Sequence, residues 1–305
     1  KALRADIFAN PSRKLVSGTE GEADAVYEYP EWCRYAADDM LNEVFENKLD
    51  GYDLDYEPEG DALEVRISDI CDRRYGIGAD GLMLLEKSPD HDFHMTYFNS
   101  DGSGGMMCGN GGRCIVAFAA DMGLANFDFD AADGFHTAQI LNVDGKTKTV
   151  RLKMKDVEGY EHHEALTGPE CASDGYFLDT GTRHYVRFVS GLDAYDIVTE
   201  GRDIRYHAEE LQPVGANVNY VEPHAGVLEV RTYEKGVENE TFACGTGIVA
   251  SCVAAFVTGH APSMTMEDGR VRYDVRAKKD DLSVDFMPSE VHVAEDVWLT
   301  GPAAF

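Results

Sequence analysis

The sequence predicts an α+β protein made of two similar halves, on three observations. Strand-like runs recur along the chain after residue 62, and two strongly apolar runs indicate buried helices. One short motif precedes each helix: Met-Cys-Gly-Asn-Gly at residues 107–111 and Ala-Cys-Gly-Thr-Gly at residues 243–247. The motifs lie about half the chain apart, which indicates a duplicated domain whose halves each supply one element of a site.

The hydrophobic pattern predicts the elements in chain order. An amphipathic helix is expected over residues 31–46, a loop over residues 50–53, a strand or helix start over residues 63–67 and a turn over residues 76–81. The two buried helices are expected over residues 114–120 and 248–257, and each ends before a glycine. Strands are expected at residues 82–85, 94–98, 150–154, 185–189, 218–221, 227–233, 271–275 and 282–286.

The composition excludes several classes of protein. The 305 residues are 44% hydrophobic, enough for one or two cores, but no run of about 18 apolar residues occurs that could span a membrane. The first residues show no secretory pattern, so we expect a cytoplasmic protein. The formal net charge of −29 repels nucleic acid and anionic lipid, so neither is expected as a partner. We interpret the acidity as a solvated surface and leave a high-salt habitat open.

The cysteines indicate thiol chemistry rather than crosslinks or metal binding. Their odd number, without a secretory pattern, speaks against a disulfide framework. No Cys-x-x-Cys pair and no zinc-finger histidine spacing occurs, so no metal is expected. The seven are Cys33, Cys71, Cys108, Cys114, Cys171, Cys244 and Cys252.

Two cysteines at the heads of two helices fit the inversion of an amino-acid stereocentre. Such a reaction removes a weakly acidic Cα proton and returns a proton to the opposite face. Without a cofactor to spread the carbanion, the protein needs two bases that face each other across the carbon. Cys108 and Cys244 suit this task, because the positive end of a helix dipole lowers a thiol pKa and one cysteine can wait as thiolate while the other waits as thiol.

The residues beside the cysteines fit the binding of a carboxylate. The backbone N–H groups of Gly109, Asn110, Gly245 and Thr246 stand where helix N-termini bind anions. They would also stabilise the charge of an aci-carboxylate intermediate. One such motif alone is more often a turn before a helix with a buried thiol. Two motifs in a duplicated layout favour a functional site.

Longer stretches around these motifs resemble the diaminopimelate epimerase family. The resemblance covers roughly residues 65 to 305, about four-fifths of the chain. The matching stretches are residues 72–81, 98–103, 107–114, 215–221, 232–236, 240–247 and 299–303. The resemblance implies epimerisation of LL-diaminopimelate to the meso form, for lysine and cell-wall synthesis, with no cofactor and a small amino acid as substrate. It leaves the oligomeric state open, a homodimer included.

The resemblance also implies roles for individual residues. Cys108 and Cys244 would be the acid–base pair, and the four backbone groups named above would hold the reacting carboxylate. His184 and Glu234 stand where the family places groups that assist the cysteines. The residues implied to bind the distal end of the substrate are Asn99, Asn217, Glu234 and Lys235. A satisfied buried histidine and a surface glutamate are the alternatives for His184 and Glu234.

The fold implied by the resemblance has two pseudo-symmetric domains. Each is a mixed, mostly antiparallel sheet wrapped around a central helix, and the active site lies in the cleft between them. The first domain would span residues 1–150 and the second residues 151–294, with residues 295–305 returning to the first.

The chain also departs from the family pattern. The Gly-Asn-Asp-Phe-type segment that normally opens the family is absent from the first 60 residues, and Gly81 replaces a glutamine of some members. Thr182 and Arg183 replace an Asn-Pro pair, and Lys235 replaces an arginine that grips a carboxylate bidentately. Two alternatives therefore stay open: racemisation of another amino acid by the same cysteine pair, and an amino-acid-binding protein without catalysis. A regulatory disulfide between the two cysteines is compatible with catalysis.

Overall fold

The computed structural model describes residues 67–104, 109–170 and 174–304. These residues form two compact units. The first unit comprises residues 67–104 and 115–137, and the second comprises residues 109–114 and the described residues from 138 to 304. The helix predicted over residues 31–46, the loop over residues 50–53 and Cys108 lie outside the described residues.

The first unit is built on a small sheet. Strand β1 (Gly81–Glu86) pairs antiparallel with β2 (Phe93–Asn99), which pairs parallel with β3 (Asp128–Ala131). Strand β3 pairs antiparallel with the start of β4 (Gly134–Asp144), which runs on into the second unit. Burial drives this packing: the fully buried rings of Phe93 and Phe129 stack with their centroids 4.8 Å apart.

The second unit contains a long mixed sheet. Its strand order is β4-β5-β15-β14-β13-β10-β9-β8-β7-β6, in which the pairs β13–β10 and β9–β8 are parallel and the others antiparallel. Short strands β11 (Asn239–Thr241) and β12 (Met264–Thr265) pair with β10 and β13. The long strands are β5 (Thr147–Lys153), β6 (Tyr160–His163), β7 (Gly175–Asp179), β8 (Arg183–Phe188), β9 (Asn217–His224), β10 (Val227–Glu234), β13 (Val271–Arg276), β14 (Asp281–Pro288) and β15 (Ala294–Ala304).

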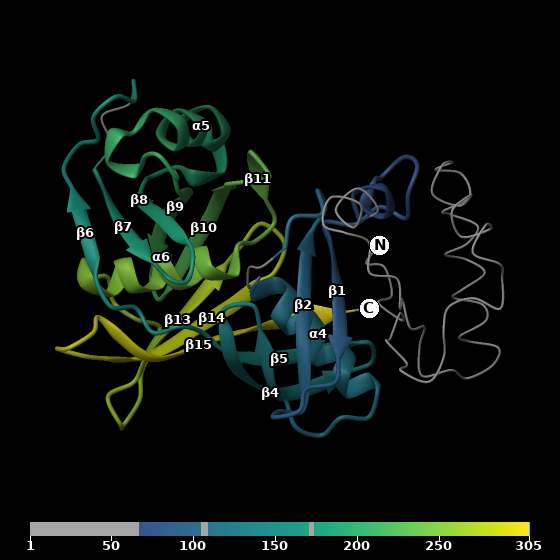
Figure 1. Cartoon of the computed structure of the whole chain (residues 1–305). Helices are drawn as coiled ribbons and strands as arrows, with labels where there is room; N and C mark the ends of the chain where they lie inside the picture. The colour runs from purple at the N-terminus through teal and green to yellow at the C-terminus, as the bar shows by residue number, and fades with distance from the viewer. Residues whose placement is uncertain (1–66, 105–108, 171–173, 305) are drawn as a thin grey trace. The chain divides into compact units, whose positions relative to one another are not determined.

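Two helices cover opposite faces of strands β8, β9 and β10 (Figure 1). Helix α5 (Ile197–His207) packs on one face over an apolar cluster, and helix α6 (Gly245–Val257), almost wholly buried, packs on the other. Because side chains alternate along a strand, each strand serves both helices. The α5 face carries Tyr185, Val218, Tyr220 and Tyr233. The α6 face carries the polar residues His184, Asn219 and Thr232.

The predicted fold class is confirmed, and so are the two buried helices. Helix α4 (Gly109–Asp121) contains the run predicted over residues 114–120, and α6 contains the whole run over residues 248–257. Both helices begin at the glycine after each motif cysteine, as the position of the cysteines at the helix heads predicts, and therefore before the apolar runs themselves. Each predicted strand overlaps an observed one. Strand β15 pairs with β5 and β14, while the domain boundaries of the sequence analysis stay a prediction. No helix of the described residues is long and apolar enough to cross a membrane.

Candidate functional site

The first residues of helices α4 and α6 approach each other closely within the second unit. Gly109 begins α4 and Gly245 begins α6. A Cβ atom added to Gly245 would lie 3.2 Å from the Cα of Gly109 and 3.0 Å from Cδ2 of Leu299. A Cβ added to Gly109 would lie 3.3 Å from the Cα of Gly245. The first glycine of each motif therefore lets the two helix starts meet, as the duplicated motifs predict.

Side chains of α4 hold this contact. The Asn110 amide donates a hydrogen bond to the carbonyl of Ala243, with 2.7 Å between Nδ2 and O. The buried guanidinium of Arg113 donates to the carbonyl of Gly109 (3.2 Å) and to Oδ1 of Asn110 (3.0 Å). The sequence analysis did not single out Arg113. The signal was a cation directly before the apolar helical run of residues 114–120, because a buried charge needs fixed partners.

Cys244 occupies the N-cap position of α6. Its backbone is extended (φ −110°, ψ 109°), and its carbonyl accepts the first helical hydrogen bond from the N–H of Ile248 at 2.8 Å. The residue is 7% exposed, and its Sγ lies 3.5 Å from Oγ1 of Thr246. The first turn of α6 contains no acidic residue that would repel a negative charge on the sulfur of Cys244. A thiolate here is stabilised by the helix N-terminus.

His184 lies beneath the start of α6 and is completely buried. Its Nε2 lies 3.0 Å from Oγ1 of Thr246 and 2.8 Å from Oγ1 of Thr182. Burial lowers the pKa of His184 to about 3, so the ring is neutral near pH 7. His184 is therefore joined to Cys244 through the hydroxyl of Thr246, and it offers the thiolate no positive charge.

The residues predicted for the distal end of the substrate form a second group. Asn217, the first residue of β9, is buried; its amide donates to the carbonyl of Arg183 (3.2 Å) and accepts from the N–H of Lys235 (2.8 Å). Glu234 ends strand β10, and its carbonyl accepts from the N–H of Glu238 at 2.8 Å. Asn217 therefore ties the start of β8 to the turn that carries Glu234 and Lys235.

Asn99 belongs to the first unit, where it ends strand β2. Its Nδ2 donates to Oγ of Ser103 at 3.0 Å, and its N–H donates to the carbonyl of Ser103 at 2.7 Å. Asn99 therefore closes a tight turn. The structure groups the predicted residues of the second unit at the start of α6 and at the turn after β10. It assigns Asn99 to the other unit and leaves Cys108 outside the described residues.

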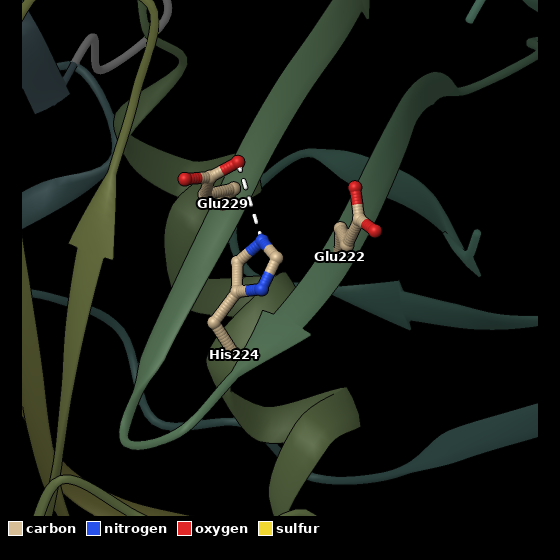
Figure 2. A group of neighbouring side chains, drawn as sticks. All are labelled: Glu222, His224 and Glu229. Atoms are coloured by element: carbon tan, nitrogen blue, oxygen red, sulfur yellow. Dashed lines mark ion pairs between the residues drawn. The ribbon is translucent and has the colours of Figure 1, made fainter. Parts of the chain in front are cut away.

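One cluster of the described residues has the side chains of a metal site: Glu222, His224 and Glu229 (Figure 2). The two carboxylates already have partners outside the cluster. The Glu222 carboxylate accepts hydrogen bonds from the N–H groups of Gly191 (3.0 Å) and Leu192 (2.7 Å), which lower its pKa. Glu229 pairs with His224 at 3.4 Å and accepts from Arg276 at 2.7 Å. We therefore assign this cluster to holding the loop at residues 191–192 against β9 and the end of β13 against β10.

Comparisons with known proteins point to one family. The family model described as diaminopimelate epimerase matches residues 54–158. A diaminopimelate epimerase of Flavobacterium psychrophilum is 40% identical over 242 residues, which cover 78% of this chain and 86% of the relative. Its counterpart in Chlorobaculum tepidum is 40% identical over 239 residues, which cover 77% of this chain and 86% of the relative.

Solved structures show the same fold at low sequence identity. A hydroxyproline epimerase from Agrobacterium vitis superposes with a TM-score of 0.59 at 14% identity, covering 82% of this chain and 80% of the other. A probable proline racemase from Agrobacterium radiobacter gives 0.58 at 18% identity, covering 82% and 81%. A PhzF-family protein from Bacillus anthracis gives 0.59 at 12%, covering 81% and 86%. These structures support the fold class alone.

Proposed function

Because the chain belongs to the diaminopimelate epimerase family, we propose that it is an isomerase that interconverts LL-diaminopimelate and meso-diaminopimelate. The family resemblance read from the sequence is thereby confirmed. One structural observation supports this function most directly: the starts of α4 and α6, each directly after a motif cysteine, lie against each other at Gly109 and Gly245. One carboxylate can then lie within reach of both helix N-termini.

In the proposed mechanism Cys108 and Cys244 act from opposite faces of the substrate Cα. One cysteine, as thiolate, removes the proton, and the other, as thiol, returns a proton to the other face. The backbone N–H groups of Gly109, Asn110, Gly245 and Thr246 bind the α-carboxylate and stabilise the charge that it gains when the Cα proton leaves. After one inversion the thiolate has become a thiol and the thiol a thiolate, which are the protonation states that the reverse reaction requires.

The distal amino-acid end of the substrate is proposed to bind Asn99, Asn217, Glu234 and Lys235. Lys235 offers a point charge where arginine would offer a planar fork, so its contact with a carboxylate is less directional. We therefore expect the same substrate as in the relatives, with weaker selection of the distal end. Neither the relatives nor the described geometry favours a different amino acid.

The experiment is a conversion assay with separated stereoisomers. Purified protein is incubated with LL-diaminopimelate, with meso-diaminopimelate and with single-centre amino acids such as histidine, and the isomers are quantified by chiral chromatography. We expect conversion of the two diaminopimelate isomers alone, and its loss in Cys108→Ala and Cys244→Ala. Conversion of another amino acid without conversion of diaminopimelate would overturn the substrate, and binding without conversion would overturn the activity.

The proposed activity also suggests where in the cell the protein works. An enzyme that makes a precursor of lysine and the cell wall is proposed to work in the cytoplasm on a free amino acid. A homodimer stays a prediction, and a measurement of the molecular mass of the protein in solution tests it. Fractionation that places the protein outside the cytoplasm would contradict the location.

A further inference from the structure

A buried chain of hydrogen bonds leads from strand β10 to the thiol of Cys244. Thr232 on β10 donates to Oδ1 of Asn219 on β9 at 2.9 Å, and the two residues are direct cross-strand partners. Nδ2 of Asn219 lies 3.1 Å from Nδ1 of His184. Nε2 of His184 lies 3.0 Å from Oγ1 of Thr246, which lies 3.5 Å from Sγ of Cys244. All five side chains are less than a tenth exposed.

The direction of this chain is set at Asn219. The same Nδ2 that faces His184 also lies 3.4 Å from the carbonyl oxygen of Tyr185, which can only accept a hydrogen bond. The amide therefore turns its nitrogen toward β8 and its oxygen toward Thr232. A rotated amide would bring two oxygens together in a buried place, at a cost comparable to a lost hydrogen bond.

The orientation of Asn219 fixes the tautomer of His184. Nδ1 of the ring receives an N–H from Asn219, so it carries no hydrogen of its own. The single ring hydrogen is then on Nε2, which faces the hydroxyls of Thr182 and Thr246. Burial lowers the pKa of the ring to about 3, so the ring is neutral near pH 7.

The hydroxyl of Thr246 passes this direction on to the cysteine. Oγ1 of Thr246 accepts from Nε2 of His184 and from the Thr182 hydroxyl at 3.0 Å. Its own hydrogen is then available to Sγ of Cys244. A hydroxyl that donates to sulfur stabilises the thiolate over the thiol, in the same sense as the helix N-terminus.

We propose that Asn219 and Thr232 are positioning residues that set the protonation balance of Cys244, because they orient His184 and, through it, the hydroxyl hydrogen of Thr246. The proposal deepens the epimerase function and rests on it for its catalytic meaning. When Cys244 takes up the Cα proton, its S–H faces Oγ1 of Thr246. The Thr246 hydroxyl hydrogen then turns away from the sulfur, and no proton is transferred along the hydrogen bonds.

The second glycine of the motif after Cys244 has a role in this arrangement. A Cβ atom on Gly247 would lie 2.3 Å from Oδ1 of Asn219 and 3.2 Å from Cε1 of His184. Only glycine lets the first turn of α6 rest on the Asn219 amide. The motif thus carries one glycine for the partner helix and one for the positioning chain.

The test measures the thiol of Cys244 without substrate. The rate of iodoacetamide alkylation is followed against pH by mass spectrometry of the Cys244 peptide, in the wild type, Thr232→Val, Asn219→Leu, Thr246→Val and Thr246→Ser. The midpoint is the pH at which the alkylation rate reaches half its maximum. We expect it to rise by about one pH unit in Asn219→Leu and Thr246→Val, which corresponds to about tenfold less thiolate near pH 7. Thr232→Val should raise it by less, and Thr246→Ser should restore it.

Two matched controls remove hydroxyls from the same helix region but leave the hydrogen bonds between Thr232 and Cys244 in place. Ser251 donates to the carbonyl of Gly247 at 2.7 Å and Thr258 donates to that of Ala254 at 2.8 Å. Ser251→Ala and Thr258→Val should leave the midpoint unchanged. An unchanged midpoint in Asn219→Leu and Thr246→Val, or equal shifts in the controls, overturns the proposal.

A second measurement needs no variant. In ¹⁵N-histidine NMR of the wild-type protein, the ring of His184 should carry its hydrogen on Nε2 between pH 6 and 8. A hydrogen on Nδ1 overturns the proposal even where Asn219→Leu fails to fold. Neither measurement involves turnover, so a protein that does not convert diaminopimelate contradicts the proposed function alone. Normal conversion with an unshifted thiol contradicts this inference alone.

Discussion

Two glycines at position 1 of their helices decide whether the site can assemble. A methyl group at Gly245 would meet the Cα of Gly109 and the side chain of Leu299. Backbone atoms cannot yield as a flexible side chain does, so the helix starts would separate. The glycines therefore matter for packing as well as for the approach of the substrate.

Gly245→Ala is expected to lower kcat by about 10-fold, because the contact at 3.2 Å displaces the helix starts by a few tenths of an ångström and a displacement of about 1 Å costs about 100-fold. The matched control is Gly159→Ala: Gly159 has open space around its Cβ position and an ordinary φ. Steady-state kinetics of both variants measure the effect. Equal activity of the two variants would mean that the contact between the helix starts is dispensable.

His184 makes the stability of the protein sensitive to acid. Its pKa is lowered by burial to about 3, whereas in the unfolded chain the pKa has the ordinary histidine value of about 6.5. Between these values the unfolded state binds the proton and the native state does not, so acidification favours unfolding. Above pH 6.5 the contribution no longer changes with pH.

The free energy of unfolding should fall by roughly 1.4 kcal/mol per pH unit from this group as the pH drops from about 6 to 4. His184→Gln, which has no titrating ring, should show a shallower fall over the same range. Urea unfolding at several pH values measures both slopes. Parallel slopes for the two proteins would show that His184 is charged in the native state.

Sequence alone could identify some of these residues and not others. Cys244, Gly245 and Thr246 stand in one motif, so local pattern was enough. Asn219 and Thr232 become neighbours only through the register of β9 with β10, and their role depends on which face meets α6. Arg113 differs from them, because its partners Gly109 and Asn110 lie four and three residues earlier in α4 and follow once that helix is known to begin at Gly109.

At the scale of elements, charged side chains fasten strand β15 to its neighbours. Asp285 on β14 accepts from Arg151 on β5 at 2.6 Å and from Arg270 at 2.9 Å. Asp296 on β15 accepts from Lys153 on β5 and from Arg270. Partial burial raises the pKa of Asp296, but these hydrogen bonds outweigh it and lower the pKa to about 2.

Asp285→Asn is expected to reduce the free energy of unfolding by about 3 kcal/mol, because it removes the negative partner of two largely buried guanidinium groups. The control on the same strand is Asp281→Asn, since Asp281 is 86% exposed and lies 3.9 Å from its partner Arg276. That change should have little effect. Denaturant unfolding compares them, and similar losses would show that the Asp285 pairs add nothing.

Strands and helices differed in how well the sequence predicted them. The apolar cores of α4 and α6 were recognisable because their burial leaves an unbroken hydrophobic run. Their first turns were predicted from the motif cysteines and not from propensity, because Gly109, Asn110 and Gly245 have low helix propensity and are helical through contacts between the two motifs. Strand β15 mixes charged and apolar residues without strict alternation, so its pattern alone did not mark it.

At the scale of the whole molecule, the net charge of −29 is the dominant feature. Self-repulsion of this kind destabilises a compact state. Salt shortens the screening length from about 10 Å at 0.1 M to about 3 Å at 1 M, and this weakens the self-repulsion. The acidic surface should therefore make the protein more stable in salt.

Raising NaCl from 0.1 M to 1 M at pH 7.5 is expected to raise the Tm by a few degrees. The same change near pH 4.5, the sequence pI, should have a much smaller effect, because little net charge remains to screen. Thermal unfolding followed by circular dichroism measures both. A Tm that is flat or falling with salt at pH 7.5 would contradict the role given to the surface charge.

The central claim is that two thiols act from opposite faces of one carbon. The most direct test is the position of deuterium early in the conversion of LL-diaminopimelate in D₂O, read by mass spectrometry of the separated isomers. A thiol carries a single exchangeable proton, so the inverted product should carry one deuterium at the new centre while the recovered substrate carries almost none. Deuterium that appears equally in recovered substrate and product, or a product that keeps its original proton, would mean that a single base serves both faces and would contradict the account.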